Sequence, residues 1–338
     1  MGAKTVNGSV AAGASWPGRG RSAKSIRKEL ARSRHVDYLV YLAVRLGVMV
    51  LHMTGRGIGY ALAGAAAAVI WRFDGCHRER ALANLRASFP DWPEARVRAA
   101  AKASIRNMAC MGLELFLTPR RIRPDTWRRY VRLTGMAEVI RMLVERKTPL
   151  VLVTGHFGNW ELAGYFSSVI GLPTHTVARR IDNPYLNDFI FGLRERAGQT
   201  MIYKAGAGEA VQRALDRNEA VSIVCDQDAG AKGIFVDFFG RPASTFKSIG
   251  LMAMQFNAPV AVVCCRRLDR RFHFEVFCRR IIHPGEWSGE DDPLRWITRE
   301  YTRALEEVVR DAPEQYFWVH RRWKSRPADK EPGDNGIA

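Results

Sequence analysis

Apolar and polar positions divide the chain into four segments. Residues 1–35 are rich in Gly, Ala, Ser, Lys and Arg and show almost no apolar periodicity, which is typical of a disordered basic arm. Residues 36–75 are the most apolar part, and residues 76–327 alternate short apolar runs with amphipathic stretches. The last segment, 328–338, is polar and contains Gly and Asp, so we expect it to be disordered as well.

The apolar segment over 36–75 has the composition of a membrane anchor, but charged residues interrupt it. A spanning helix needs about 20 mostly apolar residues, and here Arg45, His52 and Arg56 interrupt the pattern. The segment fits a tilted single span or a helical hairpin that lies in the interface with its arginines reaching the headgroups. A pair of ordinary core helices is the third arrangement that fits.

From residue 149 onward, β-branched apolar runs alternate with helical patterns. The predicted strands cover 150–154, 174–179, 200–203, 220–225, 234–238, 259–267 and 272–281. The predicted helices cover 159–170, 183–197, 208–218, 245–256 and 292–311. This alternation is typical of an α/β fold, here a layered α/β/α domain with a mostly parallel central sheet and a hairpin at 259–281.

Before this region, residues 78–117 have a helical pattern that contains one acidic residue in an apolar stretch, Glu114. Glu114 at a catalytic cleft is one reading. A capped or solvent-facing glutamate is the one we expect.

The stretch Pro149–Gly164 carries the strongest chemical signal. His156 follows the predicted strand 150–154, and Asn159 is a suitable N-cap for the helix that contains Glu161. Ligands of open α/β sheets bind at the carboxyl ends of the strands, where this histidine falls. A carboxylate bonded to the far nitrogen of an imidazole fixes its tautomer, so His156 with Glu161 predicts a general base for a hydroxyl group. An unrelated histidine and an exposed glutamate are the alternative.

Other strand ends carry polar side chains that suit substrate binding. Arg179 and Arg180 follow the strand 174–179, and guanidinium groups match phosphates and carboxylates. Asp226 and Gln227 follow the strand 220–225. The pair Asp226 and Asp228 is a weak candidate for a metal site, because no further ligand lies nearby in the sequence.

Cations recur at the start of the helix 245–256 and in the last apolar segment. Lys247 lies where a helix N-terminus favours an anion. Aromatic residues alternate with His320, Arg321 and Arg322, a composition that suits a membrane interface or an anionic headgroup. No carboxylate in the sequence is placed to orient His320 as a second base.

The charge balance demands an acidic partner. The net charge is +18 and the pI is about 10.1, which suits nucleic acid, an anionic membrane, a phosphorylated substrate or an acidic carrier protein. No nucleic-acid-binding motif accompanies the charge. The six cysteines contain no CxxC pair, and we find no P-loop, GxGxxG fingerprint or nucleophile elbow.

Several stretches together resemble one family. HFGNWE at 156–161 is similar to the HxxxxE signature of the bacterial lipid A biosynthesis acyltransferases, the lauroyl and myristoyl transferases. Further blocks follow in the family's order: NLRASFPDWPEA (84–95), ARRIDNP (178–184), CDQDAG (225–230), FVDFFGRPAST (235–245) and APEQYFWVHRRWKSRP (312–327).

The resemblance implies a fatty acyl chain carried by acyl carrier protein or coenzyme A and moved to a hydroxyl of lipid A or a related glycolipid. It implies His156 and Glu161 as the catalytic dyad, Arg179 as the arginine of an R-x-x-D-N-P block, and structural or acceptor-orienting roles for Asp226 and Gln227. It also implies no cofactor or catalytic metal, no nucleic acid, and attachment to the inner face of the cytoplasmic membrane. Other membrane lipids stay open as acceptors, namely a phosphatidylinositol mannoside, an ornithine lipid or a glycerolipid, and so does a non-catalytic basic membrane-binding protein.

Overall fold

The computed structural model describes residues 34–327 except residue 197. Most of these residues pack around a central, mostly parallel sheet. Within these residues seven strands form one sheet in the order β1-β9-β8-β2-β5-β3-β4. The strands are β1 (Val131–Thr134), β2 (Leu150–Thr154), β3 (His175–Ala178), β4 (Thr200–Tyr203), β5 (Ala220–Val224), β8 (Val260–Arg267) and β9 (Phe274–Ile282). All neighbours are parallel except β8 and β9, which form an antiparallel hairpin. The predicted fold class is therefore confirmed.

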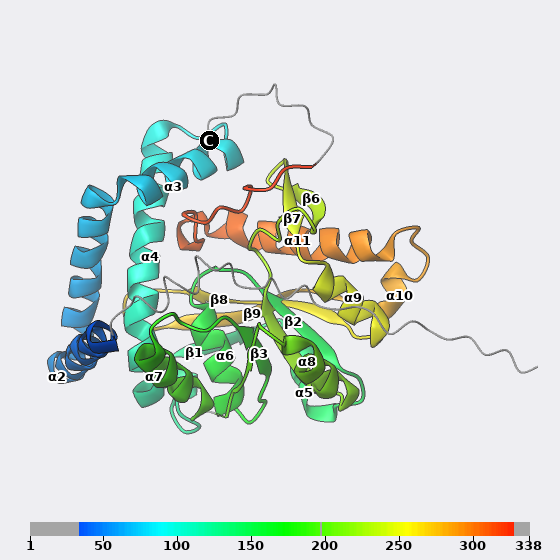
Figure 1. The fold of residues 1–338 in the computed structure, drawn as a ribbon, viewed down its shortest axis with the longest axis horizontal. Coiled ribbons are helices and arrows are strands. Elements are labelled where there is room, and N and C mark those ends of the chain that lie inside the picture. Colours follow the sequence, from blue (N-terminus) through cyan, green and yellow to red (C-terminus); the bar gives the residue numbers. More distant parts are fainter. Residues whose placement is uncertain (1–33, 197, 328–338) are drawn as a thin grey trace, which may run out of the picture.

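Helices cover both faces of the sheet (Figure 1). They are α5 (Ala137–Glu145), α6 (Trp160–Val169), α7 (Pro184–Glu195), α8 (Ala207–Asp216), α9 (Lys247–Gln255), α10 (Pro284–Trp287) and α11 (Pro293–Asp311). Successive residues of β2 point to opposite faces: Val151 and Val153 share a core with α8, α9 and α11, whereas Leu150 and Leu152 share one with α5 and α6. Every residue of β2 is buried, as expected of a strand covered on both sides.

Three helices stand beside this layered domain (Figure 1). They are α2 (Arg34–Phe73), α3 (Gly75–Ser88) and the long α4 (Glu94–Arg121). The apolar segment of the sequence is α2, which is interrupted at Gly55, whose φ of 79° and ψ of 168° are not helical. The second half of α2 packs on α4 through Tyr60, Ala63 and Cys110. In the described part of the chain α2 is one helix that is long and apolar enough to cross a membrane, judged by length and composition.

Most predicted elements agree with the structure to within a few residues, and the exceptions are short. The strand β1 and the helix α5 were not predicted. The strand β7 (Arg241–Thr245) pairs with β6 (Ile234–Phe238) outside the main sheet, so Thr245 ends a strand and does not cap a helix. Short 3₁₀ turns η1 (Trp127–Arg129) and η2 (Pro313–Gln315) complete the elements. The tail over 328–338 and the arm over 1–35, apart from Arg34 and His35, lie outside the described residues.

Candidate active site

A tight turn between β2 and α6 carries His156, and every backbone N–H of this turn is bonded within the protein. The N–H of Phe157 donates to the Gly155 carbonyl (2.7 Å). The N–H of Gly158 donates to Gln315 (2.9 Å), and that of Asn159 to Cys265 (2.9 Å). At Gly158 the backbone has φ of 59°, and a Cβ would lie 1.8 Å from the Cys265 carbonyl oxygen. Only glycine fits here, because both the positive φ and the close approach exclude a side chain.

The imidazole of His156 is held by Asp226, which directly follows β5. The distance from His156 Nδ1 to Asp226 Oδ1 is 2.6 Å, and the backbone N–H of His156 donates to Asp226 Oδ2 over 2.8 Å. The pairing follows from the sheet, since β2 and β5 are parallel neighbours and both residues lie just beyond their carboxyl ends. The side chain of Asp226 is 1% exposed and that of His156 is 14% exposed.

The electrostatics favour an ionised Asp226. Burial alone would raise the pKa of this carboxyl group, but the adjacent His156, its two hydrogen bonds and the nearby His320 lower the pKa well below its usual value. An anionic Asp226 accepts a hydrogen bond from Nδ1–H, so Nε2 of His156 carries the lone pair that can take a proton. This is the tautomer that a general base requires.

Aromatic rings lie around the imidazole of His156, and one amide lies near its Nε2. The ring of Trp160 stands edge-on at 4.8 Å between centroids, and that of Phe317 lies at 6.0 Å. Gln227 Nε2 lies 3.5 Å from His156 Nε2. The ring of His320 lies 4.6 Å from that of His156. Burial and the adjacent His156 lower the pKa of His320 to about 4, so that it is neutral at pH 7.

The last segment of the chain completes this site. Phe157 and Tyr316 form an isolated antiparallel bridge, and the Phe317 N–H donates to the His156 carbonyl (3.0 Å). From α3, the amide of Asn84 donates to the carbonyls of Trp318 (2.7 Å) and His320 (3.0 Å). Blocks that lie some 160 residues apart in the sequence, 156–161 and 312–327, therefore meet at one site.

The family is decided by sequence comparison. The model of the bacterial lipid A biosynthesis acyltransferases matches residues 27–325. The chain belongs to this family. The resemblance seen in the ordered sequence blocks is thereby confirmed, and the protein is an O-acyltransferase.

Three curated relatives match between 38% and 86% of the chain. The lipid A biosynthesis lauroyltransferase of Escherichia coli (strain K12) is 27% identical over 298 residues, which are 86% of this chain and 90% of the relative. The lipid A biosynthesis palmitoleoyltransferase of the same organism is 30% identical over 183 residues, 52% of this chain and 56% of the relative. A phosphatidylinositol mannoside acyltransferase of Mycobacterium tuberculosis (strain ATCC 25618 / H37Rv) is 27% identical over 131 residues, 38% of this chain and 42% of the relative.

The glutamate of the family's HxxxxE signature has a different partner from the one we expected. Both carboxylate oxygens of Glu161 accept from Arg194 of α7, over 2.7 and 2.9 Å, while Nδ1 of His156 is bonded to Asp226. Glu161 is the second residue of α6, so the turn that begins the helix carries its side chain to α7. The expected bond between Glu161 and His156 is therefore corrected to one between Asp226 and His156.

Two residues predicted to bind substrate are buried by the protein itself. Asn159 is 0% exposed, and its side chain accepts from the Leu162 N–H at the start of α6 and donates to Glu114. Arg322 is 2% exposed and donates to the Ser244 carbonyl and to the Thr245 hydroxyl. Both are therefore corrected from substrate contacts to structural supports.

The remaining predicted cations are exposed. Arg179 pairs with Asp182 (3.1 Å), and the guanidinium of Arg180 lies 4.1 Å from the ring centroid of Tyr203. Lys247 begins α9 on the surface, and Arg321 is exposed beside the buried Arg322. Their binding of substrate stays a prediction.

The second carboxylate after β5 has a structural role. Asp228 accepts from the backbone and the hydroxyl of Ser325 (3.2 and 3.0 Å) and from the Gly230 N–H (3.2 Å). Asp228 thus fastens the last described segment to the loop after β5. Among the described residues no group of three or more His, Cys, Asp or Glu side chains could hold a metal ion.

Proposed function

We propose that the protein transfers a fatty acyl chain from an acyl thioester to a hydroxyl of lipid A or a related glycolipid, with His156 as general base and Asp226 as its partner. The observation that carries the proposal is the bond of 2.6 Å between His156 Nδ1 and the buried Asp226. It holds the base in the required tautomer at the carboxyl end of the sheet, in a member of an acyltransferase family.

In the proposed reaction the acyl group passes to the acceptor oxygen, and the proton of the acceptor hydroxyl passes through His156 to the departing thiolate. Nε2 of His156 takes the proton of the acceptor hydroxyl as its oxygen attacks the thioester carbonyl, and the imidazolium is stabilised by Asp226. The tetrahedral intermediate collapses to the new ester when the C–S bond breaks. The thiolate leaves with little acid help, because thiols ionise near pH 8.5, and it then takes up the proton from His156. No covalent acyl-enzyme forms.

The oxyanion of the intermediate needs a donor, and the backbone of the turn supplies none that is free. The N–H groups of His156, Phe157 and Gly158 already donate within the protein. Gln227 takes this role in our proposal, since its amide lies 3.5 Å from His156 Nε2. A donor fixed next to the base stabilises the charge that develops there.

The membrane-facing part of the proposal rests on α2. Its most apolar 18-residue window is only 11% buried, and Leu39, Leu46 and Met53 expose 63%, 57% and 79% of their surface. A soluble domain rarely exposes such a continuous apolar face. We propose that α2 anchors the protein to the cytoplasmic (inner) membrane with the site on the cytoplasmic face, and that the charge of +18 favours anionic lipid and an acidic carrier or the phosphates of coenzyme A.

A second acceptor class has specific support. Phosphatidylinositol mannoside acyltransferases are among the relatives, so the same chemistry on that glycolipid is the alternative. The two acceptors differ in their headgroups, while the base His156 and the acyl thioester donor are the same in both proposals.

The proposal is tested by lipid mass spectrometry on a strain in which the gene is deleted and then restored as wild type or as His156→Ala. We expect the deletion to leave one glycolipid lighter by one acyl chain, and only the wild type to restore it. The mass of that lipid identifies the acceptor and the chain length. Restoration by His156→Ala, or no change in any acylated lipid, would overturn the proposal.

A further inference from the structure

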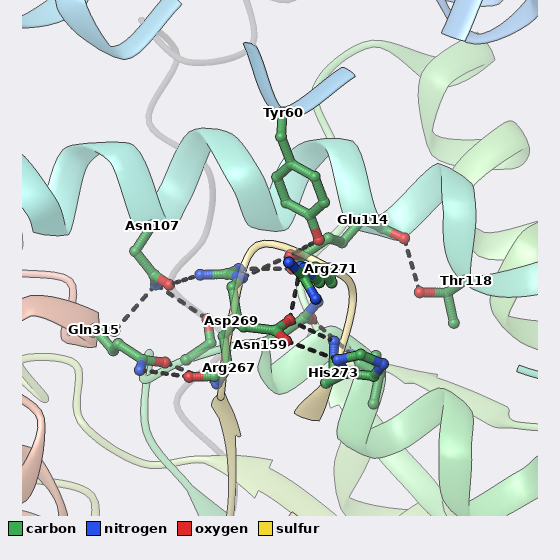
Figure 2. A network of polar contacts seen from close by, with 12 residues as sticks. Tyr60, Asn107, Glu114, Thr118, Asn159, Arg267, Asp269, Arg271, His273 and Gln315 are labelled. Atoms are coloured by element: carbon green, nitrogen blue, oxygen red, sulfur yellow. Dashed lines mark hydrogen bonds and ion pairs between the residues drawn. The ribbon is translucent and has the colours of Figure 1, made fainter. Parts of the chain in front are cut away.

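Glu114 is a buried charged residue of α4, bonded to Asn159 at the start of α6. Its side chain is 0% exposed and paired with Arg267, which corrects our expectation of a capped or solvent-facing glutamate. Three donors from three other parts of the chain satisfy it (Figure 2): Tyr60 of α2 (2.7 Å), Asn159 at the start of α6 (2.8 Å), and Arg267 at the end of β8, which donates to both oxygens at 2.6 Å.

The same network holds the backbone that follows His156. Asn159 donates its backbone N–H to Cys265 and caps α6 with its side-chain oxygen. Asn107 of α4 accepts from Arg267 and donates to the carbonyls of Gly158 (3.1 Å) and Gln315 (3.2 Å). Gln315 exchanges two hydrogen bonds with the backbone of Arg267 (2.8 and 2.9 Å). Gly158, Asn159 and Gln315, which fix the turn, are thus all tied to the Glu114–Arg267 pair.

The buried carboxylate of Glu114 does more than occupy space in the core. A buried ion pair stabilises little compared with apolar side chains of the same shape, because both charges lose their hydration. Here the pair is bonded to Asn159, which lies three residues after the base and also caps α6. Such an arrangement fixes one geometry, and geometry is what a general base depends on.

We propose that Glu114 is a positioning residue for the acyl transfer: through Asn159 and Arg267 it fixes the turn that presents His156, and through Tyr60 it ties this turn to α2. The inference rests on the proposed role of His156 as base. It adds a residue that never touches substrate, and it places part of the support for the catalytic turn in the helix that we propose as the anchor.

The test compares two buried glutamates in the purified full-length protein. Glu275 of β9 is also buried (side chain 4% exposed) and is also held by arginines, Arg132 and Arg266, and by Thr134. Glu114→Gln and Glu275→Gln each remove one carboxylate charge from an arginine. Acyl transfer is measured with a fatty acyl thioester and the glycolipid extracted from the deletion strain, and thermal unfolding is measured on the same samples.

We expect Glu114→Gln to lower kcat by about 10- to 100-fold, the effect of a slightly misplaced catalytic group, with little change in KM for either substrate. The pH dependence of kcat should keep its shape, because the His156–Asp226 pair is intact. Glu275→Gln should lower the unfolding temperature but leave kcat unchanged. Wild-type kcat in Glu114→Gln, or an equal loss of kcat in both variants, would overturn the inference.

Two milder variants serve if Glu114→Gln fails to fold. Asn159→Ser keeps an N-cap for α6 but removes the donor to Glu114, and Tyr60→Phe removes a single hydroxyl. We expect both to fold and to lower kcat, Tyr60→Phe by the smaller factor, and unchanged kcat in both would overturn the inference. His156→Ala distinguishes a failure of the proposed function from a failure of the proposed role of Glu114. If it is fully active, the proposed function fails; if it is inactive while Asn159→Ser and Tyr60→Phe are fully active, only the role of Glu114 fails.

Discussion

Two carboxylates near the site, Asp226 and Glu161, have different hydrogen-bond partners. The difference distinguishes a residue that takes part in the proton transfer from one that supports the fold. Asp226 lies 70 residues from His156 in the sequence and contacts its imidazole, a group that gains and loses a proton. Glu161 lies five residues from His156 and is held by a guanidinium, whose charge is permanent. A carboxylate whose two oxygens both accept hydrogen bonds from arginine is paired with a charge that does not change during the reaction. A carboxylate bonded to imidazole stabilises the imidazolium that forms when the base takes a proton.

The difference also shows what a spaced motif reports. His156 and Glu161 are close in sequence because both belong to one strand–turn–helix unit, in which the strand end presents the base and the helix begins one residue before the glutamate. Arg194 then ties α6 to α7 through Glu161. We infer that the HxxxxE signature reflects the packing of this strand–turn–helix unit, through Glu161, as well as the catalytic role of His156.

The largest effect should come from Asp226→Asn. The amide retains an acceptor for Nδ1 but lacks the charge that holds the tautomer and stabilises the imidazolium, so we expect kcat to fall by about 10⁴-fold with the fold intact. Steady-state acyl transfer by the purified protein measures this. Near-normal kcat in this variant would show that Asp226 only supports the backbone of His156.

A smaller effect should come from breaking the other pair. We expect Glu161→Gln and Arg194→Gln each to lower kcat by about 10- to 100-fold, through displacement of α6 and α7, and to lower the free energy of unfolding by about 1–3 kcal/mol. The double variant should be little worse than either single one, because the two residues act as a unit. If Glu161 instead served His156 directly, Arg194→Gln would keep nearly full activity while Glu161→Gln lost it.

The third effect is on stability alone: a pH dependence that arises at His320, beside the His156–Asp226 pair. Burial beside His156 lowers the pKa of His320 to about 4, while an unfolded histidine titrates near 6.5. Between these values the unfolded chain binds a proton that the folded protein does not, so stability falls as the pH drops from about 6.5 to 4, by up to about 3 kcal/mol.

Thermal unfolding at several pH values between 5 and 7.5 measures this dependence, and His320→Gln should flatten it. Asp226 contributes in a lower window, because its depressed pKa keeps its stabilisation intact above about pH 4 and loses it only as the pH falls further. An unchanged slope in His320→Gln would assign the dependence to other groups.

The local pattern of the sequence predicted much of this fold. The bounds of β2 and the N-cap at Asn159 are confirmed, as is the antiparallel hairpin of β8 and β9. The elements that were missed carry weak patterns: β1 has four residues, and β7 contains Pro242 and few apolar residues. A break in the segment 36–75 was part of two of the three arrangements considered, but its position at Gly55 was not predicted, since a single glycine inside an apolar helix does not by itself indicate a break.

The candidate site was harder to predict because its contacts depend on the order of the strands. His156 and Asp226 each follow a buried run, which was visible, but only the adjacency of β2 and β5 brings them together. Glu114 has its partner Arg267 153 residues away, and helical periodicity cannot reveal such a pairing. His320 was set aside for lack of a nearby carboxylate in the sequence, yet in the structure it lies beside His156 and near Asp226, which follow β2 and β5.

The most direct test is the ratio of two rates. We would measure kcat for Asp226→Asn and for Arg194→Gln side by side, with the same acyl thioester and the glycolipid extracted from the deletion strain. If Asp226 is the partner of the base and Glu161 a support, kcat of Asp226→Asn should be about 100-fold or more below that of Arg194→Gln. An Asp226→Asn protein as active as Arg194→Gln would contradict the assignment of the His156–Asp226 pair as the base.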